Sequence, residues 1–310
     1  MNYLCIDGGT TNTRVRLVRD GVITDSVSSA TGSSDRDNTA LKNACREMIS
    51  EILARNGLAE KDISLAVASG MITSEFGLYH LPHITVPADL DKIRSCAKKV
   101  SLDICGIPFL FTPGLRHVEK GGNMMRGEEL ESIGLCAKYG ITEPTAIILP
   151  GTHNKVILYE DGYITEINNM MSGEMFSLLV NNSILRHCFP DGLPKGFDEE
   201  ALFLGAEETR EFGLTEAALR IRCIANGGEK SSLWLKSYLS GAVFYCDIQA
   251  IEKKCLGRTL LLGGDRKLKE QMSSLIRRYL PQLKLIEVSD EDGAEATALG
   301  QLMAANGISL

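Results

Sequence analysis

Two stretches of this chain, residues 3–23 and 146–164, repeat the same order of features, and this duplication limits the fold more than any other property of the sequence. In each stretch an apolar run ends at a glycine-threonine turn, at residues 9–10 or 151–152, and a second apolar run follows. An Asp-Gly pair then leads into a third run at nearly the same interval. The pattern predicts strand, tight turn, strand, hairpin turn and strand. We therefore predict a duplicated domain, with one copy at the start of each half.

The glycine-threonine turns carry groups that suit phosphate. Glycine lets the backbone bend and lets a ligand approach closely, and the turn offers N–H, hydroxyl and amide donors to phosphate oxygens. One such turn is also typical of an ordinary hairpin with a polar tip, but two at matched spacing favour a nucleotide held between them. The predicted nucleotide-binding residues of the turns are Gly8, Gly9, Thr10, Thr11, Asn12 and Arg14, and Gly151, Thr152, His153, Asn154 and Lys155.

Two further features extend this predicted nucleotide site. Asp7 lies at the mouth of the first turn, where a carboxylate can hold a phosphate-bound Mg²⁺ through water. The second copy has Pro150 at that place, so we expect metal binding and proton transfer to fall to the N-terminal half and the connecting segment. Near the C-terminus, the apolar run 259–262 ends in Gly263 and Gly264 before a predicted helix, a corner that admits the adenosine of a nucleotide.

The connecting segment supplies the acid-base candidates. Arg126 precedes Glu128 and Glu129 at the start of a predicted helix. Acidic residues in a first helical turn often only complement the helix dipole. The functional alternative is that one of the two glutamates is a general base at a cleft and that Arg126 binds an anionic substrate.

Polar residues at predicted strand ends are the substrate candidates. Strands alternate with helices, as in the predicted strand 64–68 after the predicted helix 38–56, so we expect an α/β domain with ligands beyond the carboxyl ends of its strands. The loop 69–77 follows such an end and is either a substrate contact or a plain connection. Ser172 is expected to cap a helix whose first turn holds Glu174, a second-rank candidate. The predicted substrate-binding residues are Gly70, Met71, Ser74, Arg116, Arg126 and Glu174.

Length, composition and charge limit the class of protein. The 310 residues suffice for two domains, and 44% hydrophobic with 24% charged residues is a globular balance. The net charge of −7 argues against a broad basic surface for nucleic acid or membrane. Nine cysteines without a C-x-x-C pair, and no secretory or membrane-length apolar run, predict a cytoplasmic protein with reduced thiols.

Later periodic segments complete the expected elements. Residues 198–226 and 232–255 are predicted to be helical, and the second carries a core stripe. Residues 284–288 are predicted to form a last strand. Small residues in the terminal helix, from residue 292, favour close packing.

These motifs resemble the superfamily of ATPase domains shared by sugar kinases, heat-shock chaperones and actin. Residues 7–12 resemble its first phosphate motif, 150–155 its second and 261–264 its adenosine motif. The resemblance implies an α/β, two-domain actin-like ATPase fold of duplicated ribonuclease H-like βββαβαβα domains with a nucleotide cleft between them. The domains it implies are 1–125, completed by the terminal helix 293–310, and 126–292.

Longer segments resemble the 2-dehydro-3-deoxygalactonokinase family. They are S-G-M at 69–71, N-M-M-R-G-E-E at 123–129, P-G-T-H-N-K at 150–155 and M-S-G-E at 171–174. The resemblance implies ATP- and Mg²⁺-dependent phosphorylation of the 6-hydroxyl of 2-dehydro-3-deoxy-D-galactonate in galactonate catabolism. The partners that the resemblance implies are then a sugar acid and ATP. A homodimer is one alternative for the oligomeric state.

The resemblance also assigns roles to particular residues. Glu128 is the first choice for the base, because related sugar kinases place an acid at the start of this helix, and Glu129 is the alternative. Asp7 is expected to position Mg²⁺, and Arg116 and Arg126 to bind the substrate carboxylate. The residues expected to hold the β- and γ-phosphates are Thr10, Thr11, Asn12, Thr152 and Lys155.

Two positions depart from the family pattern. Members usually carry a tryptophan where Gly8 stands and often an aromatic residue where Val156 stands. We expect Val156 to affect packing only and Gly8 to face the cleft and alter the substrate pocket.

Three other functions stay open at this point. The chain could be a kinase of the same fold for another sugar or sugar acid, a non-catalytic ATP-gated switch or a phosphatase. The R-G-E-E segment at residues 126–129 weighs against the phosphatase.

Overall fold

The computed structural model describes residues 1–34, 36–119 and 122–306. The chain forms two compact units. The first comprises Met1–Thr142, Tyr159–Ile167 and Glu291–Leu310, and the second Glu143–Leu158 and Asn168–Asp290.

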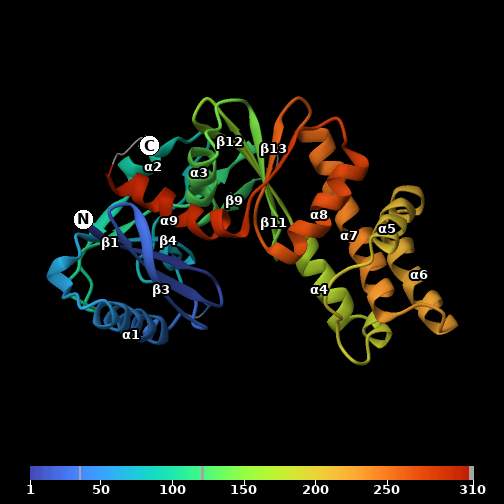
Figure 1. The fold of residues 1–310 in the computed structure, drawn as a ribbon, viewed down its shortest axis with the longest axis horizontal. Coiled ribbons are helices and arrows are strands. Elements are labelled where there is room, and N and C mark those ends of the chain that lie inside the picture. Colours follow the sequence, from blue (N-terminus) through green and yellow to red (C-terminus); the bar gives the residue numbers. More distant parts are fainter. Residues whose placement is uncertain (35, 120–121, 307–310) are drawn as a thin grey trace. The chain divides into compact units, whose positions relative to one another are not determined.

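The main sheet of the first unit has the strand order β3-β2-β1-β4-β7-β6. β1 pairs antiparallel with β2, as in a hairpin, and parallel with β4, which the chain reaches through a crossover connection. Helix α1 packs beside this sheet, and α9 runs past β1 and β4 (Figure 1). The elements are β1 (Asn2–Gly8), β2 (Thr13–Arg19), β3 (Val22–Ser29), α1 (Thr39–Arg55), β4 (Leu65–Gly70), β6 (Lys98–Val100), β7 (Phe109–Phe111) and α9 (Asp290–Asn306).

The two faces of β1 are buried against different helices. Leu4 and Ile6 lie in one hydrophobic cluster with α1. Tyr3 and Cys5, which alternate with them, pack with Ala298 of α9 on the opposite face. A strand covered on both sides has a nearly continuous apolar run, which explains the sequence at the start of the chain.

Helix α3 packs on α9 so closely that glycine is required at the contact. A Cβ on Gly134 would lie 2.0 Å from the Ala296 carbonyl oxygen, and one on Gly300 would lie 2.0 Å from that of Leu130. Small residues in the terminal helix therefore do favour close packing. Through this contact α3 belongs to the first unit, whereas the sequence analysis placed it in the domain 126–292. Residues 307–310 of the predicted terminal helix lie outside the described residues.

Short elements complete the first unit. A smaller sheet has the order β5-β8-β9 and precedes α3 in the chain. The elements are η1 (Glu60–Asp62), η2 (Met71–Thr73), β5 (Ile84–Thr85), α2 (Leu90–Cys96), β8 (Leu115–His117), β9 (Asn123–Met125) and α3 (Glu128–Lys138).

The second large sheet, with the order β12-β11-β10-β13-β14, repeats the order of the first. Its β10, β13 and β14 are parallel, like β1, β4 and β7. Both Asp-Gly pairs adopt left-handed conformations, with φ of 49° and 86° at residues 20–21 and 52° and 84° at 161–162, as hairpin turns require. The predicted duplication is confirmed. The strands are β10 (Thr145–Leu149), β11 (Asn154–Glu160), β12 (Tyr163–Met170), β13 (Thr259–Leu262) and β14 (Leu285–Glu287).

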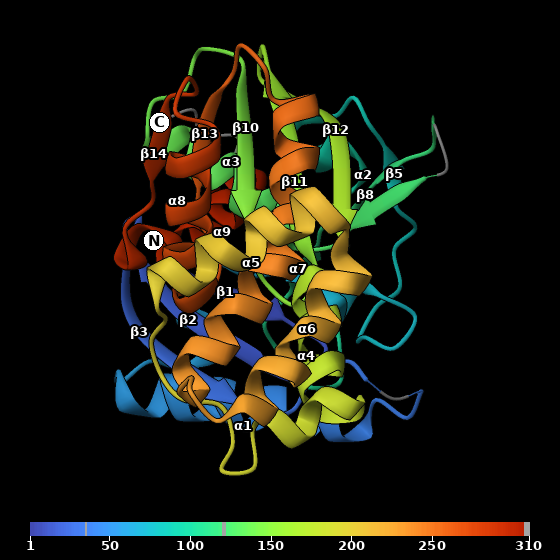
Figure 2. The ribbon, with the colours of Figure 1, turned by 90° about the vertical axis from the view of Figure 1, so that its right-hand side faces the viewer.

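The helices of the second unit form a group around α7 (Figure 2). The predicted helix 198–226 is two helices, because Gly213, with φ of 83°, ends α5. Within residues 1–34, 36–119 and 122–306, no helix is both long and apolar enough to cross a membrane. The elements are α4 (Ser172–Asn182), η4 (Ile184–Cys188), α5 (Glu199–Phe212), α6 (Leu214–Gly227), α7 (Ser232–Lys254) and α8 (Arg266–Tyr279).

Candidate active site

Loop 1, residues 9–12 between β1 and β2, is a tight turn with exposed donors. The Gly9 N–H donates to the Asn12 carbonyl oxygen at 2.7 Å, and the Ser33 N–H donates to the Gly9 carbonyl oxygen at 3.0 Å. Thr10, Thr11 and the Asn12 side chain are exposed. Backbone hydrogen bonds therefore fix the turn, while its hydroxyl and amide side chains stay accessible to a ligand.

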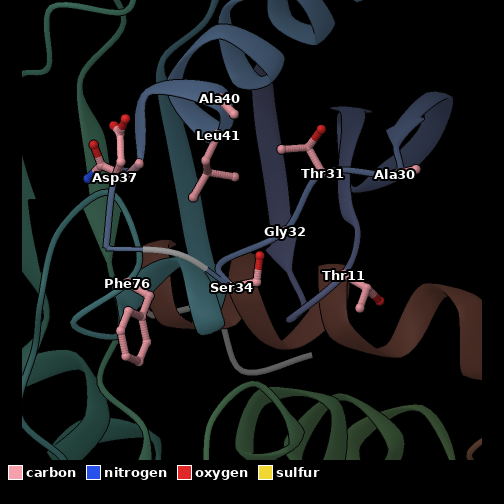
Figure 3. Close-up of a pocket in the computed structure, with 10 residues that line it drawn as sticks. Thr11, Ala30, Thr31, Gly32, Ser34, Asp37, Ala40, Leu41 and Phe76 are labelled. Carbon is pink, nitrogen blue, oxygen red and sulfur yellow. The ribbon is translucent and has the colours of Figure 1, made fainter.

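A pocket of about 270 Å³ lies beside loop 1. In Figure 3, Asp37 and Phe76 lie on one side of it and Thr11 and Thr31 on the other. Of the polar residues that line this pocket, Thr11 is predicted from the sequence. Asp37 is not, because nothing in the sequence indicates that the start of α1 lies near loop 1.

The ends of β1 and β4 meet the start of α3 at one corner. A Cβ on Gly70 would lie 2.4 Å from the Gly8 carbonyl oxygen and 3.3 Å from Asp7 Oδ1, and one on Gly127 would lie 3.1 Å from the Gly70 Cα. Gly70 and Gly127 also have φ of 83° and 112°, which suit glycine. The three backbone segments are thus in close contact, and they bring Asp7 and the first residue of α3, Glu128, to the same corner.

The charges at this corner act on one another. Burial raises the pKa of Asp7, the guanidinium groups of Arg16 and Arg14 lower it, and the carboxylate of Glu128 raises it further. Arg16 is buried on β2, and its Nη1 has no hydrogen-bond partner among the described residues. Basic residues on β2 and an acidic residue on α3 are therefore close enough to Asp7 to act on its charge.

The two candidate bases, Glu128 and Glu129, differ sharply in exposure. The Glu129 side chain is fully buried, and its two oxygens accept from the Gly127 N–H at 2.9 and 2.8 Å. Glu128 is partly exposed, and its Oε2 accepts from the Arg126 N–H at 3.0 Å. A general base must reach the proton that it removes. This geometry favours Glu128.

Glu129 should instead make the stability of the fold depend on pH. Burial and then the charge of Glu128 raise the pKa of Glu129 from 4.5 to about 8. Between these values the native state keeps a proton that the unfolded chain has lost, so the free energy of unfolding decreases as pH rises. We expect Glu129→Gln to flatten this decrease, by up to about 1.4 kcal/mol per pH unit. Urea unfolding between pH 4.5 and 8 measures it, and an unchanged slope would contradict the assignment.

Arg126 holds the loop around residues 73–83. Its Nη1 donates to the Thr73 carbonyl oxygen at 2.8 Å and to Thr73 Oγ1 at 2.6 Å, and its Nη2 donates to the Leu81 carbonyl oxygen at 2.9 Å. Nη2 also lies 3.2 Å from His83 Nδ1. The guanidinium is therefore occupied by protein acceptors, unlike the open carboxylate-binding group that the sequence analysis expected.

An imidazole that was not among the predicted site residues, that of His83, lies beside Arg126. Burial, followed by the charges of Arg126 and Arg116, lowers the pKa of His83 to about 4. Arg116, on β8, is exposed and forms no ion pair within the described part of the chain. A neutral imidazole and an open guanidinium together can bind a carboxylate.

Three other predicted residues of the first unit differ in exposure. Gly8 is buried, and a Cβ there would lie 2.6 Å from Ile72 Cβ, so Gly8 does not face an open cleft. The Ser74 hydroxyl, which is largely buried, accepts from the Phe76 N–H at 3.2 Å. Met71 begins η2 and is partly exposed.

Loop 2, residues 150–153 between β10 and β11, is tied to the start of α4. The Glu174 N–H donates to the Thr152 carbonyl oxygen at 2.8 Å, and Glu174 Oε2 lies 2.6 Å from His153 Nε2. Glu174, predicted to contact substrate, therefore pairs with His153 of the loop. The largely buried Lys155 donates from Nζ to the His153 carbonyl oxygen at 3.0 Å.

The predicted adenosine corner packs directly on loop 2. A Cβ on Gly264 would lie 2.5 Å from the Pro150 carbonyl oxygen, which also accepts from the Asp265 N–H at 2.9 Å. Asp265 caps α8 by accepting from the N–H groups of Lys267 and Leu268. Gly263 donates its N–H to the Ile148 carbonyl oxygen at 2.9 Å. Two motifs far apart in the sequence, 150–155 and 261–264, thus form one surface.

A pocket of about 320 Å³ lies next to this corner and is lined by residues of α4, α7, α8 and the segment 193–197. It combines apolar walls with lysine side chains, a composition that suits a planar base on an anionic ligand. Its lining includes Phe176, Leu193, Phe197, Lys195, Lys236 and Lys267.

The repeated sheet order and the glycine-rich loops define an α/β, two-domain actin-like ATPase fold, the class shared by sugar kinases. A crystal structure of a Sinorhizobium meliloti protein assigned as a 2-dehydro-3-deoxygalactonokinase has this fold, with a TM-score of 0.83 over 98% of both chains at 21% identity. The sequence model of the 2-keto-3-deoxy-galactonokinase family matches residues 7–303, and the chain belongs to this family.

Two curated relatives carry the same assignment. The chain is 26% identical over 218 residues to 2-dehydro-3-deoxygalactonokinase of Escherichia coli (strain K12), covering 67% of this chain and 70% of the relative. It is 27% identical over 213 residues to a Rhizobium meliloti (strain 1021) protein assigned the same activity, covering 67% and 66%. The second alignment thus spans just under two thirds of that relative.

Proposed function

We propose that this protein is a kinase that transfers the γ-phosphoryl group of ATP to the 6-hydroxyl of 2-dehydro-3-deoxy-D-galactonate, giving 2-dehydro-3-deoxy-6-phosphogalactonate. Family membership supports the substrate. The observation that carries the chemistry is the corner where Asp7, Gly70 and Glu128 meet. All nine cysteines are free, which supports a cytoplasmic setting.

The acceptor chemistry is assigned to Glu128. Its carboxylate takes the proton of the sugar 6-hydroxyl while that oxygen bonds to the γ-phosphorus and the bond from the γ-phosphorus to the bridging oxygen of ADP breaks. Phosphoryl transfer passes through a loose transition state, so the protein mainly positions the groups and stabilises charge. The start of α3 suits this role, because Glu128 is held through its contact with the Arg126 N–H but stays partly exposed.

The nucleotide is assigned to loop 2 and the adjoining glycine corner. Thr152 and Lys155 are proposed to contact phosphate oxygens. The corner at Gly263 and Gly264, which packs directly on Pro150, is proposed to adjoin the ribose. The adenine is proposed to occupy the pocket lined by residues of α4, α7, α8 and the segment 193–197. The exposed Thr10, Thr11 and Asn12 of loop 1 are proposed to donate to phosphate as well.

Mg²⁺ fits the groups present in the first unit. The described residues contain no cluster of three or more His, Cys, Asp or Glu side chains that could hold a metal alone. Mg²⁺ commonly binds through one or two carboxylates, water and substrate phosphates, and Asp7 supplies such a carboxylate next to Gly70. When bound, Mg²⁺ would neutralise charge on the transferring phosphate.

A coupled assay of ADP release tests the proposed function. The purified protein is mixed with ATP, Mg²⁺ and, in turn, 2-dehydro-3-deoxygalactonate, its gluco epimer, other sugar acids and no acceptor. We expect turnover with the galacto compound and a 6-phosphorylated product by mass spectrometry. Turnover with a different sugar acid alone would show that the proposed substrate is wrong. Hydrolysis of ATP without any acceptor would indicate a phosphatase. Binding of ATP without turnover would indicate an ATP-gated switch.

Alanine substitutions at Arg116 and Arg126 should affect different properties, the first the KM for the sugar acid and the second the melting temperature. Arg116→Ala should raise the KM for the sugar acid about ten- to a hundredfold, because charge-assisted hydrogen bonds contribute about 1.5–3 kcal/mol. Its melting temperature should stay unchanged, since Arg116 is exposed. Arg126→Ala should lower the melting temperature, because Thr73 and Leu81 lose their donor. A normal KM for Arg116→Ala would remove Arg116 from the site.

A further inference from the structure

The two glycine-threonine loops are closed by different groups. In loop 1 the Gly9 N–H donates to the backbone carbonyl oxygen of Asn12 at 2.7 Å. In loop 2 the Gly151 N–H donates instead to the side-chain oxygen of Asn154, Oδ1, at 2.8 Å. Loop 2 therefore depends on the orientation of one amide side chain, which could present either its oxygen or its nitrogen to Gly151.

A buried carboxylate on α7 fixes that orientation. Asp247 is fully buried, and its Oδ2 accepts from Asn154 Nδ2 at 2.5 Å. Burial raises the pKa of Asp247 to about 6, against the hydrogen bonds from Ser172 and Asn154, so the group is mainly a carboxylate at neutral pH. A carboxylate can only accept hydrogen bonds. The Asn154 nitrogen must then face Asp247, which leaves its oxygen toward Gly151.

The same carboxylate also holds the helix that supports loop 2. The hydroxyl of Ser172, the first residue of α4, donates to Asp247 Oδ1. The sequence analysis expected Ser172 to cap α4, but the capping position is Met171 and the hydroxyl is turned to Asp247. The residues after Ser172 then support the loop, since the Glu174 N–H donates to the Thr152 carbonyl oxygen.

We propose that Asp247 is a positioning residue for ATP binding, which holds loop 2 in its phosphate-binding form through Asn154 and Ser172 without touching the nucleotide. The inference rests on the proposed function, in which loop 2 contacts the phosphates. It assigns a role to an acid that lies about ninety residues beyond the loop in the sequence. The glycine-threonine motif of loop 2 gives no indication of this contact.

The test compares Asp247 variants in the full-length protein. Asp247→Ala should weaken binding of Mg²⁺ and a non-hydrolysable ATP analogue at least tenfold by calorimetry and raise the KM for ATP to match, while the KM for the sugar acid changes less than twofold. Asp247→Asn should stay within about threefold of wild type, because its oxygen still accepts from Asn154 and its amide can donate to the Ser172 hydroxyl. Thr209→Val is the matched control, since the Thr209 hydroxyl also bonds to α7, at the Ala242 carbonyl oxygen, away from loop 2.

A paired exchange decides the question if Asp247→Ala fails to fold. Asn154→Asp would place two carboxylates 2.5 Å apart and should lose ATP binding at least tenfold. Adding Asp247→Asn to Asn154→Asp should restore most of the loss, because the amide introduced at position 247 can donate to the carboxylate introduced at position 154.

Several outcomes would overturn the inference. Equal loss of ATP affinity in Asp247→Ala and Thr209→Val, parallel changes in both KM values, or no restoration in the paired exchange would each show that Asp247 acts only on stability. A wild-type protein that binds the ATP analogue but phosphorylates no sugar acid would contradict the proposed substrate, and the binding comparison would still decide the role of Asp247. A wild-type protein without ATP binding would overturn both.

Discussion

Replacing Glu128 with glutamine should lower kcat with the sugar acid about 10²- to 10⁴-fold, the usual effect of removing a general base. Glutamine keeps the side-chain oxygen that accepts from the Arg126 N–H, so the start of α3 should stay in place. The KM for ATP should change little, because Glu128 is assigned to the acceptor. Steady-state kinetics with both substrates varied measures the three constants.

Two neighbours provide controls for this prediction. Glu131→Gln removes the same charge from the first turn of α3 and should leave kcat within a few-fold of wild type. Glu129→Gln removes a carboxylate that is fully buried and should mainly affect stability. A larger loss of kcat in Glu129→Gln than in Glu128→Gln, in folded protein, would move the base to Glu129.

Adding one methyl group at Gly173 should disrupt loop 2. A Cβ there would lie 2.1 Å from the Gly151 carbonyl oxygen and 3.0 Å from that of Thr152, so loop 2 or α4 must shift. Overpacking of this kind costs about 1–3 kcal/mol. If loop 2 takes up the shift, ATP affinity should fall roughly five- to a hundredfold. Calorimetry with a non-hydrolysable analogue and thermal unfolding report affinity and stability separately.

A glycine in open space is the matched control for Gly173→Ala. Gly227, the last residue of α6, has nothing within 4 Å of the place where a Cβ would stand. Gly227→Ala should leave ATP affinity unchanged and stability equal or up to about 1 kcal/mol higher, because alanine favours helix. Unchanged ATP affinity in Gly173→Ala would show that loop 2 tolerates displacement and that its contact with α4 does not set the phosphate site.

The hairpins could be predicted because their signals are local. An Asp-Gly pair readily adopts the left-handed conformation of a hairpin turn, as at 20–21 and 161–162, and the apolar runs nearby are typical of buried strands. Both copies of the hairpin are therefore visible in the sequence. The same holds for the close packing of the terminal helix, where small residues such as Gly300 are the only ones that fit.

Other features could not be predicted, because they depend on which groups meet after folding. Glu128 and Glu129 are equivalent by position, yet one is partly exposed and the other fully buried. Arg126 looked like an anion site, and its guanidinium instead bonds to Thr73 and Leu81. A sequence motif names residue types, but it does not say which side chains the fold has already paired.

The sequence by itself determined the duplicated α/β architecture, the two glycine-threonine loops and the family, since these depend on local backbone preference and on the spacing of motifs. Tertiary structure alone decided how those loops are held. The Gly70 and Gly127 backbones bring Asp7 to Glu128, and Asp247 orients Asn154 from a helix far along the chain. Hydrogen bonds and close packing act over a few ångströms, so their partners are set by the path of the chain in space and not by its order.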